Sequence, residues 1–239
     1  MRSGLTVRTA GRLAGLTAVL WITAGGTAGA ATATATSPSS SPSPSSSASP
    51  SSSPSPSSSA SPHPSPSADS WTVYHGDPAG RGVAASAGVV DTTSRAWTSP
   101  ALDGQLYGEP LVSAGRVYVA TENDTVYALS AATGKVAWSR HLASPVPASS
   151  LPCGDIEPTV GITGTPVIDP ARVEVFVVAD QESGGRPAHV LTGLSTATGR
   201  VEMTRDVDPA GADTATLLQR TGLTLAGGRV VFGFGGNDG

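Results

Sequence analysis

The sequence predicts an all-β fold for residues 69–239, preceded by a long segment that cannot build a core. Three observations support this prediction. Short apolar runs rich in Val and Tyr alternate with turn residues, no stretch keeps the 3.6-residue period of a helix, and several runs recur further along the chain. Together they indicate many short antiparallel strands rather than helices.

The first 30 residues have the order of a secretory signal peptide. Three arginines lie within the first twelve residues, an apolar stretch follows at 13–24, and small residues occupy 28–30. That stretch is too short to cross a membrane, which needs about 20 apolar residues. We expect cleavage after Ala30 and export, with an uncleaved signal anchor as the alternative. No Cys follows the apolar stretch, which excludes a lipid anchor at a lipobox.

Residues 31–68 are predicted to be a disordered Ser/Pro-rich linker. Positions 37–67 hold 19 Ser and 9 Pro, and the sequence PSSSPSPSSSAS at Pro38–Ser49 recurs at Pro50–Ser61. A segment without apolar side chains has no burial to offset an ordering cost of roughly 1–2 kcal/mol per residue. Dense proline favours an extended chain, so the linker is either an inert spacer or an O-glycosylated stalk.

Charge and cysteine content exclude two classes of site. Lys and Arg number 14 against 18 Asp and Glu, and no basic stripe occurs, so no nucleic-acid partner is expected. The single cysteine, Cys153, cannot form an internal disulfide, and no second Cys or His cluster suggests a zinc site. A structural or disulfide-forming role is expected for Cys153 rather than a catalytic one.

The expected strands fall into three sets along the chain. Most prolines outside the linker lie at strand starts or between strands, where a missing N–H is tolerated. The expected strands are 110–113, 116–121, 125–130 and 135–141, then 164–168, 173–179, 189–195 and 200–206, then 223–226 and 229–234.

Internal repetition groups these strands into larger units. ALSAATGKVAW at Ala128–Trp138 matches GLSTATGRVEM at Gly193–Met203 across a shift of 65 residues, and AGRVYVA at Ala114–Ala120 matches GGRVVFG at Gly227–Gly233. Repeats of about 40–65 residues with four short strands are typical of β-propeller blades. The fold class is therefore a partial β-propeller of four-stranded antiparallel blades, with about two complete blades and parts of others.

One stretch resembles a known family. GRVYVATENDTVYALSAATGKVAW, at Gly115–Trp138, resembles the PQQ-binding-like β-propeller repeat, in which a strand and a turn precede a motif of the form ALDxxTGxxxW. The family includes quinoprotein alcohol dehydrogenases and the propeller subunit of the outer-membrane barrel assembly machinery. The resemblance covers most of residues 71–239, and Leu151–Asp169 and Gln219–Gly239 are similar to a secreted bacterial subgroup.

The residues of the repeat motif have structural roles. A glycine ends a tight turn that needs a positive φ, and hydroxyls bond backbone groups of that turn. The resemblance implies that Trp138 docks against the adjacent blade, where the next repeat has Met203 instead; serines replace the usual Asp of the motif. The repeat-motif residues are Ser130, Thr133, Gly134, Trp138, Ser195, Thr198 and Gly199.

The number of expected strands predicts an incomplete ring. They make two complete blades and half of a third, and a lone outer strand is expected at Arg95–Ser99, which contains Trp97. A closed propeller has four to eight blades, so three blades would leave open edges. We therefore expect a truncated part of a longer propeller. The resemblance implies that relatives continue past the position of Gly239 and can carry a second cysteine there, which would be a disulfide partner for Cys153.

Acidic residues and histidines give no site by spacing alone. The acidic residues nearest recognisable motifs lack the spacing of a metal site; they are Glu109, Glu122, Asp155 and Glu157. Asp206 and Asp208 resemble the start of a calcium loop, but Ala210 and Leu217 stand where oxygen ligands are required, so a solvated loop is expected. His189 is expected to be an isolated histidine.

These observations predict an exported, non-catalytic β-propeller that acts as a binding or scaffolding module outside the membrane. Its partner is an unknown protein or cell-envelope component. No catalytic, cofactor-binding or metal-binding residue is expected, and no cofactor is needed. The alternative is a fragment of a PQQ-dependent quinoprotein dehydrogenase, which would require PQQ and calcium.

Overall fold

A computed structural model describes residues 22–23, 70–84, 95–152 and 154–236. The predicted signal peptide (except residues 22–23), the predicted linker and Cys153 lie outside these residues. The described part contains strands and two single-turn 3₁₀ segments but no α-helix, which confirms the all-β prediction. The 3₁₀ segments are η1 (Ala148–Ser150) and η2 (Thr214–Thr216).

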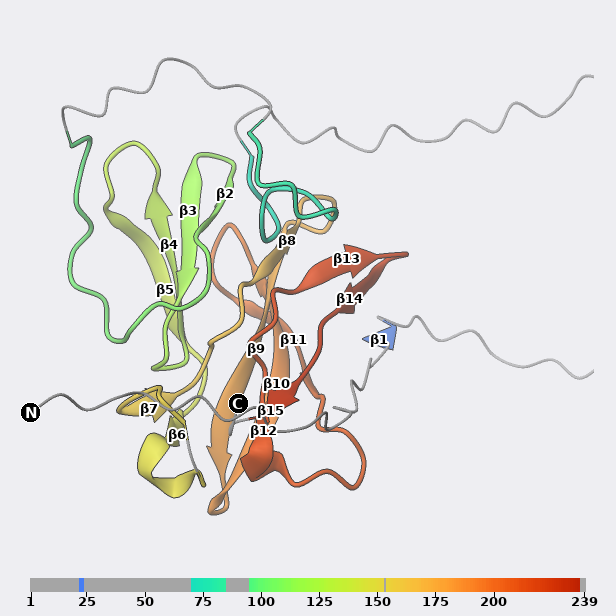
Figure 1. Ribbon diagram of the computed structural model, residues 1–239. Helices are drawn as coiled ribbons and strands as arrows, with labels where there is room; N and C mark the ends of the chain where they lie inside the picture. Colours follow the sequence, from blue (N-terminus) through green and yellow to red (C-terminus); the bar gives the residue numbers. More distant parts are fainter. Residues whose placement is uncertain (1–21, 24–69, 85–94, 153, 237–239) are drawn as a thin grey trace, which may run out of the picture.

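Two four-stranded antiparallel sheets form the body of the molecule (Figure 1). In each sheet the strands lie side by side in sequence order, so hairpins alone connect them. This is the expected blade topology. Blade 1 consists of β2 (Leu111–Ser113), β3 (Arg116–Ala120), β4 (Thr125–Ser130) and β5 (Val136–His141). Blade 2 consists of β8 (Val167–Asp169), β9 (Glu174–Ser183), β10 (Arg186–Ser195) and β11 (Val201–Asp206).

A smaller hairpin follows blade 2. It consists of β13 (Thr224–Ala226) and β14 (Arg229–Val231), which we call blade 3, and the two-residue strand β1 (Ile22–Thr23) pairs antiparallel with β14. Two short ladders complete the described strands. They pair β6 (Val146–Pro147) with β7 (Thr159–Val160) and β12 (Leu217–Leu218) with β15 (Gly235–Gly236).

The central strand β9 shows how the blades stack. Its side chains alternate between two faces, as a strand requires. Val175, Val177 and Ala179 join a core cluster with blade 1, whereas Phe176 and Val178 join a second cluster with blade 3. Both faces of blade 2 are therefore buried against a neighbouring sheet, which is the side-by-side packing of propeller blades.

The β9–β10 hairpin is longer than expected. The first strand was expected to end at Ala179 and the second to begin at His189, but pairing continues to Ser183 opposite Arg186. Gly184 and Gly185 form the two-residue turn, with φ of 60° and 85°. A turn with positive φ at both central residues matches the twist of the flanking strands, so the ladder extends up to it.

Residues 95–99 do not form the expected outer strand. The structure describes these residues, but they form no strand, because no described strand pairs with them. Trp97 instead holds the segment in place through its side chain: its indole Nε1 donates a hydrogen bond of 2.8 Å to the carbonyl oxygen of Ala131.

Glu109 ties the segment at 71–76 to blade 1. One carboxylate oxygen accepts from Trp71 Nε1 and the other from the backbone N–H of His75, each at 2.9 Å. The backbone N–H of Glu109 donates to Thr165 Oγ1 at 2.9 Å. A single side chain therefore connects the amino-terminal segment with the start of blade 1.

We expect Glu109→Ala to loosen this segment. Loss of both acceptors should lower the free energy of unfolding by about 1–2 kcal/mol, because the two donors are only partly buried and water can replace one acceptor. Native-state hydrogen exchange should show reduced protection at residues 71–76. Glu109→Gln is the control, since it keeps one oxygen acceptor and should lose less. Unchanged protection in Glu109→Ala would contradict the anchoring role.

Candidate functional site

Trp138, on β5, joins blade 1 to blade 2. Its indole Nε1 donates a hydrogen bond of 3.0 Å to the carbonyl oxygen of Thr196, in the turn after β10. The ring lies against Gly199, which has φ of +68°; a Cβ there would lie 2.5 Å from the ring carbon Cε3. A residue with a side chain would therefore displace the indole as well as strain the backbone.

Trp97 makes the same contact one blade earlier. It bonds the turn after β4 through the carbonyl oxygen of Ala131, and its ring lies against Gly134, which has φ of +69°. A Cβ on Gly134 would overlap the indole ring. The two junctions thus repeat one geometry, in which an indole from the preceding segment rests on a Thr-Gly turn of the next blade.

The other repeat-motif residues shape these turns. Thr133 Oγ1 accepts from the backbone N–H of Lys135 at 3.4 Å, and the backbone carbonyl of Ser130 accepts from Gly134 at 2.8 Å. Ser130 therefore takes part through its backbone rather than through the expected hydroxyl bond. The same pattern recurs in blade 2 with Ser195, Thr198, Gly199 and Arg200.

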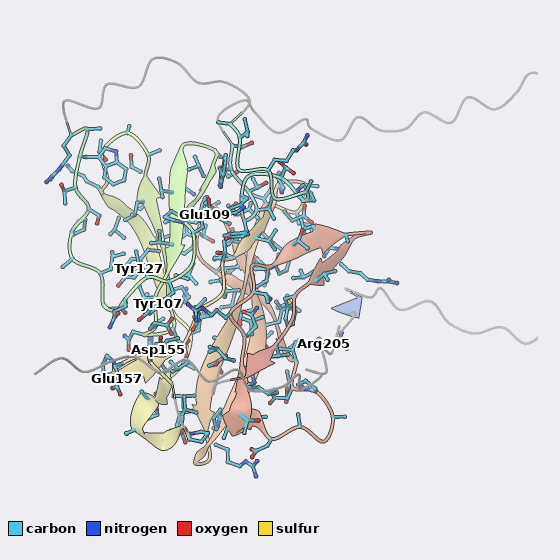
Figure 2. All side chains as sticks on the ribbon, viewed as in Figure 1. Tyr107, Glu109, Tyr127, Asp155, Glu157 and Arg205 are labelled. Carbon is cyan, nitrogen blue, oxygen red and sulfur yellow. The ribbon has the colours of Figure 1, made fainter. Side chains whose placement is uncertain are left out.

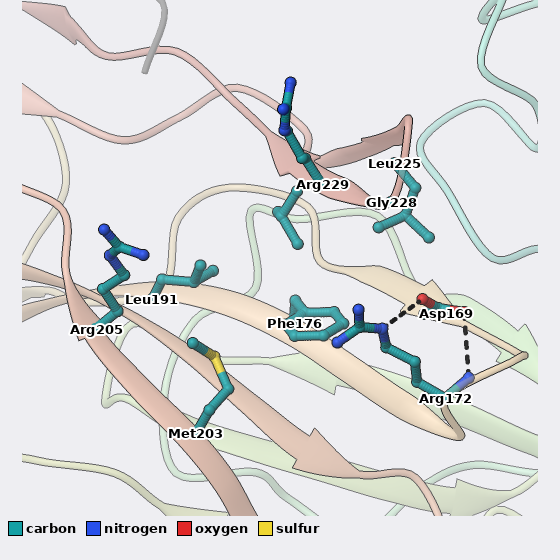
Figure 3. A pocket seen from close by; sticks show the side chains of 10 residues that line it. Asp169, Arg172, Phe176, Leu191, Met203, Arg205, Leu225, Gly228 and Arg229 are labelled. Atoms are coloured by element: carbon teal, nitrogen blue, oxygen red, sulfur yellow. Dashed lines mark hydrogen bonds and ion pairs between the residues drawn. The ribbon is translucent and has the colours of Figure 1, made fainter. Parts of the chain in front are cut away.

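Met203 occupies the position on β11 that Trp138 occupies on β5. Figure 3 shows it near Leu191 and Phe176, at a cavity of about 60 Å³ that Leu225 of blade 3 also lines. A flexible thioether thus stands at this position in place of the indole of blade 1.

Buried ionisable side chains lie at the strand ends of blades 1 and 2 that are away from the Trp138 contact. Glu122 and Asp124 face the segment that leads into blade 2. Asp180 and His189 lie on the face of blade 2 that packs toward blade 3. We call these side chains together the junction cluster. The four side chains Glu122, Asp124, Asp180 and His189 are only 0–3% exposed. The first two come from the β3–β4 turn, the third from β9 and the fourth from β10. Asp208, which follows β11, completes the junction cluster.

His189 lies between two carboxylates. Its Nδ1 is 2.6 Å from Asp208 Oδ1, and its Nε2 is 3.4 Å from Asp180 Oδ1. The ring of Phe234 packs edge-on, with centroids 4.8 Å apart. Burial alone lowers the pKa of His189, but the hydrogen bonds and negative charges of Asp180 and Asp208 outweigh it and raise the pKa to about 9. The imidazole is therefore cationic at neutral pH.

Glu122 faces the segment that leads into blade 2. Its Oε2 accepts from the backbone N–H of Gly161 at 2.7 Å and from Thr163 Oγ1 at 3.1 Å, while its Oε1 has no hydrogen-bond partner within residues 70–84, 95–152 and 154–236. Burial outweighs these hydrogen bonds and, with the negative charge of Asp180, raises the pKa of Glu122 to about 7.

Asp124 is the least satisfied member of the junction cluster. It has φ of 53° in the β3–β4 turn, and both of its carboxylate oxygens are buried without a hydrogen-bond partner among the residues that the structure describes. Gly161 packs so closely that a Cβ there would lie 2.7 Å from Asp124 Oδ1. Burial, together with the charges of Asp180 and Glu122, raises the pKa of Asp124 to about 9. Its carboxyl group is therefore neutral at pH 7.

The four acidic residues noted in the sequence are dispersed. Figure 2 shows Glu109 well separated from Asp155 and Glu157, which lie in an exposed loop between η1 and β7. Glu122 alone belongs to the junction cluster. The solvated loop expected at Asp206–Asp208 is wrong for Asp208, because its carboxylate bonds His189; His189 is correspondingly not an isolated histidine.

The Gly-Gly turn of the β9–β10 hairpin could have predicted that Asp180 lies opposite His189. If Gly184-Gly185 is taken as a two-residue turn, Ser183 lies opposite Arg186, and counting back three residues on each strand places Asp180 opposite His189. No comparable local signal brings Asp124 to this pair, because they come from different blades.

The chemistry available to the described residues is limited. No three acidic, histidine or cysteine side chains among them gather closely enough to hold a metal ion.

A cavity of about 580 Å³ lies between the segment at 72–78, β8 and β13; its apolar lining includes Val73, Val167 and Leu225. No helix in the described part of the chain has the length and apolarity to span a membrane.

Comparisons with known proteins identify the family. The family described as outer membrane protein assembly factor BamB matches residues 71–239. A search of the curated proteins found no match. Among solved structures, BamB from Moraxella catarrhalis is similar, with 19% sequence identity and a TM-score of 0.44 over 61% of this chain. The alignment spans 40% of that BamB chain. The family match covers well over half of the sequence, and it shows that the chain belongs to the BamB family of PQQ-like β-propeller repeats.

Proposed function

We propose that this chain is a non-catalytic β-propeller module that binds or scaffolds a partner outside the cytoplasmic membrane. The observation that carries the proposal is the burial of its reactive groups. The side chains with strongly shifted pKa values are only 0–3% exposed and are enclosed within the stacked blades. Catalytic acids and bases must reach a substrate, whereas these groups contact only protein.

The residues present do not fit PQQ. A quinone with several carboxylates needs cations around it. The residues that line the cavity of about 580 Å³ include two acidic residues, Asp77 and Asp169, and no Lys or Arg. The junction cluster is also predominantly acidic and is closed to a molecule of that size. These features favour a binding module over a quinoprotein dehydrogenase.

The place of action follows from the amino-terminal sequence and the family. The signal-peptide pattern indicates export, and the family is described as an outer membrane protein assembly factor. We therefore place the module in the cell envelope or outside the cell, with a protein or envelope component as its partner. The excess of acidic over basic residues argues against nucleic acid.

PQQ titration tests the non-catalytic assignment. The purified full chain is mixed with PQQ and Ca²⁺, and quinone absorbance and dye-linked alcohol oxidation are recorded beside a known quinoprotein dehydrogenase. We expect no saturable absorbance change and no turnover. Saturable PQQ binding with alcohol oxidation would overturn the proposal and favour the dehydrogenase alternative.

Export needs a separate test. When the full sequence is expressed in a bacterial host, we expect the chain to accumulate outside the cytoplasm, with a mature amino terminus at Ala31. Accumulation in the cytoplasm with an intact amino terminus would contradict the envelope assignment, whatever the outcome of the PQQ titration.

A further inference from the structure

The junction cluster cannot be fully ionised in the folded chain. It holds five ionisable side chains, four of them acidic, and His189 is the single base among them. Arg220 acts on Glu122 from outside the junction cluster, but it is exposed. Buried like charges repel strongly when water is excluded, so the junction cluster must bind protons in order to close.

Asp124 is the group that must be neutral. Its two oxygens have no hydrogen-bond donor in the described part of the chain. The charged groups that act on it are Asp180 on β9 and Glu122 on its own turn, both acidic. On the solvent side of the same turn, Asp103 and His141 both bond Thr125 Oγ1 and offer Asp124 no counter-charge. A carboxylate at this position would be buried, unpaired and next to two further carboxylates.

The contacts around Asp124 join the two blades. The backbone N–H of Gly161 donates to Glu122 Oε2 at 2.7 Å, and the backbone N–H of Asp180 donates to the carbonyl oxygen of Gly161 at 3.2 Å. Residue 161 thus lies between the β3–β4 turn of blade 1 and β9 of blade 2. Repulsion that moves Asp124 away would break this connection.

We propose that the junction cluster is a buried proton-binding site that latches blade 1 to blade 2. Asp124 holds a proton in the closed junction, while His189 holds its proton on the other face of blade 2, beside Phe234. Loss of the Asp124 proton at alkaline pH releases the β3–β4 turn from residue 161 and β9. The Trp138 contact at the other end does not titrate, so the junction opens from one side.

The direction of the pH dependence follows from the pKa shifts. The pKa of Asp124 is raised from 3.8 to about 9, so the folded chain binds an extra proton and stability falls as pH rises through this range. The pKa of His189 is raised from 6.5 to about 9, so its contribution is complete below pH 6.5 and is lost as pH rises through 9. The pKa of Glu122 is raised from 4.5 to about 7, so its deprotonation also lowers the stability as pH rises between these two values.

Denaturant unfolding of the full chain at several pH values tests the latch. Between pH 7 and 8.5 we expect the unfolding equilibrium constant to rise by about ten- to hundredfold per pH unit in the natural chain. In Asp124→Asn, which keeps the shape without the titration, the rise should be smaller by up to about tenfold per pH unit. Asp103→Asn is the matched control, because Asp103 has a lowered pKa and should leave the slope unchanged in this range. Equal slopes in the natural chain and Asp124→Asn would overturn the proposal.

Infrared spectroscopy detects the protonated carboxyl group itself and does not require cooperative unfolding. At pH 7 we expect a C=O band of protonated carboxylic acid that weakens at alkaline pH. In Asp124→Asn the band should be weaker at pH 7, with the remaining intensity from Glu122 and Asp180, whose pKa values are also raised. Absence of the band in the natural chain at pH 7 would overturn the proposal. The proposal would also be overturned if Ca²⁺ stabilised the natural chain and reduced the pH dependence of its unfolding free energy, but had no such effect on Asp124→Asn. A cation would then occupy the junction cluster.

Hydrogen exchange locates the opening. As pH rises from 7 to 9, protection of the Gly161 and Asp180 amides should fall relative to amides in the middle of β3, after correction for the intrinsic rate. Uniform loss of protection over both blades would show that the protons act on global folding and not on this contact.

Discussion

Trp138→Ala is expected to lower the free energy of unfolding by about 2–4 kcal/mol, the range for a large aromatic truncated at a partly buried position. The substitution removes the ring that lies on Gly199, the hydrogen bond to Thr196 and a packing partner of Tyr118, whose ring centroid lies 6.1 Å away. Because no other side chain can fill the space, a cavity remains between the blades. Denaturant unfolding of the full chain measures the loss.

Two further variants separate the contributions of Trp138. Trp138→Phe keeps an aromatic ring against Gly199 but loses the N–H donor, so a cost of about 1 kcal/mol is expected. Val136→Ala, on the same strand but 39% exposed, should change stability by less than about 0.5 kcal/mol. If Trp138→Ala costs no more than Val136→Ala, the indole does not hold the blades together.

Gly199→Ala should cost about 2–5 kcal/mol for two reasons. A non-glycine residue in the left-handed region costs roughly 1–2 kcal/mol, and overpacking adds about 1–3 kcal/mol. The overpacking arises because the new Cβ would lie 2.5 Å from Trp138 Cε3. The chain must then shift either the turn or the indole. Thermal or denaturant unfolding of the full chain gives the total cost.

Gly211→Ala is the matched control for Gly199→Ala. Gly211 has φ of +78°, yet a Cβ there would meet no atom within 4 Å. Its substitution should therefore cost the backbone strain alone, about 1–2 kcal/mol. The excess in Gly199→Ala measures the contact with Trp138, and equal costs would mean that the indole moves freely. In Trp138→Ala the excess should vanish, since the clashing ring is gone.

The strands were predictable where the local pattern is strong. The segment at Thr125–Ser130 has its expected bounds because a hairpin turn precedes it and a Thr-Gly turn follows it. The β9–β10 hairpin was underestimated, since polar residues such as Gln181 and Glu182 near its tip do not resemble a buried strand. The short strands β6, β7, β12 and β15 have two residues each, too few to show a period.

The junction cluster was not predictable from spacing. Asp124 and Asp180 are 56 positions apart in the sequence, and nothing local to either residue indicates a buried acidic pair. The sequence suggested a turn at Asp124 and a strand end near Asp180, and both descriptions agree with the structure. The electrostatic effect of Asp180 on Asp124 depends on how one blade is placed against the next.

Repetition along the chain was sufficient to establish a propeller, its four-stranded blades and the glycine turns, because these depend on local conformation and on side-chain periods within one unit. The partners of Trp138, the burial of Asp124 and the place of Asp208 beside His189 depend on contacts between distant segments. Such contacts arise only when blades stack and exclude water, and that exclusion turns ordinary surface residue types into a proton-binding junction.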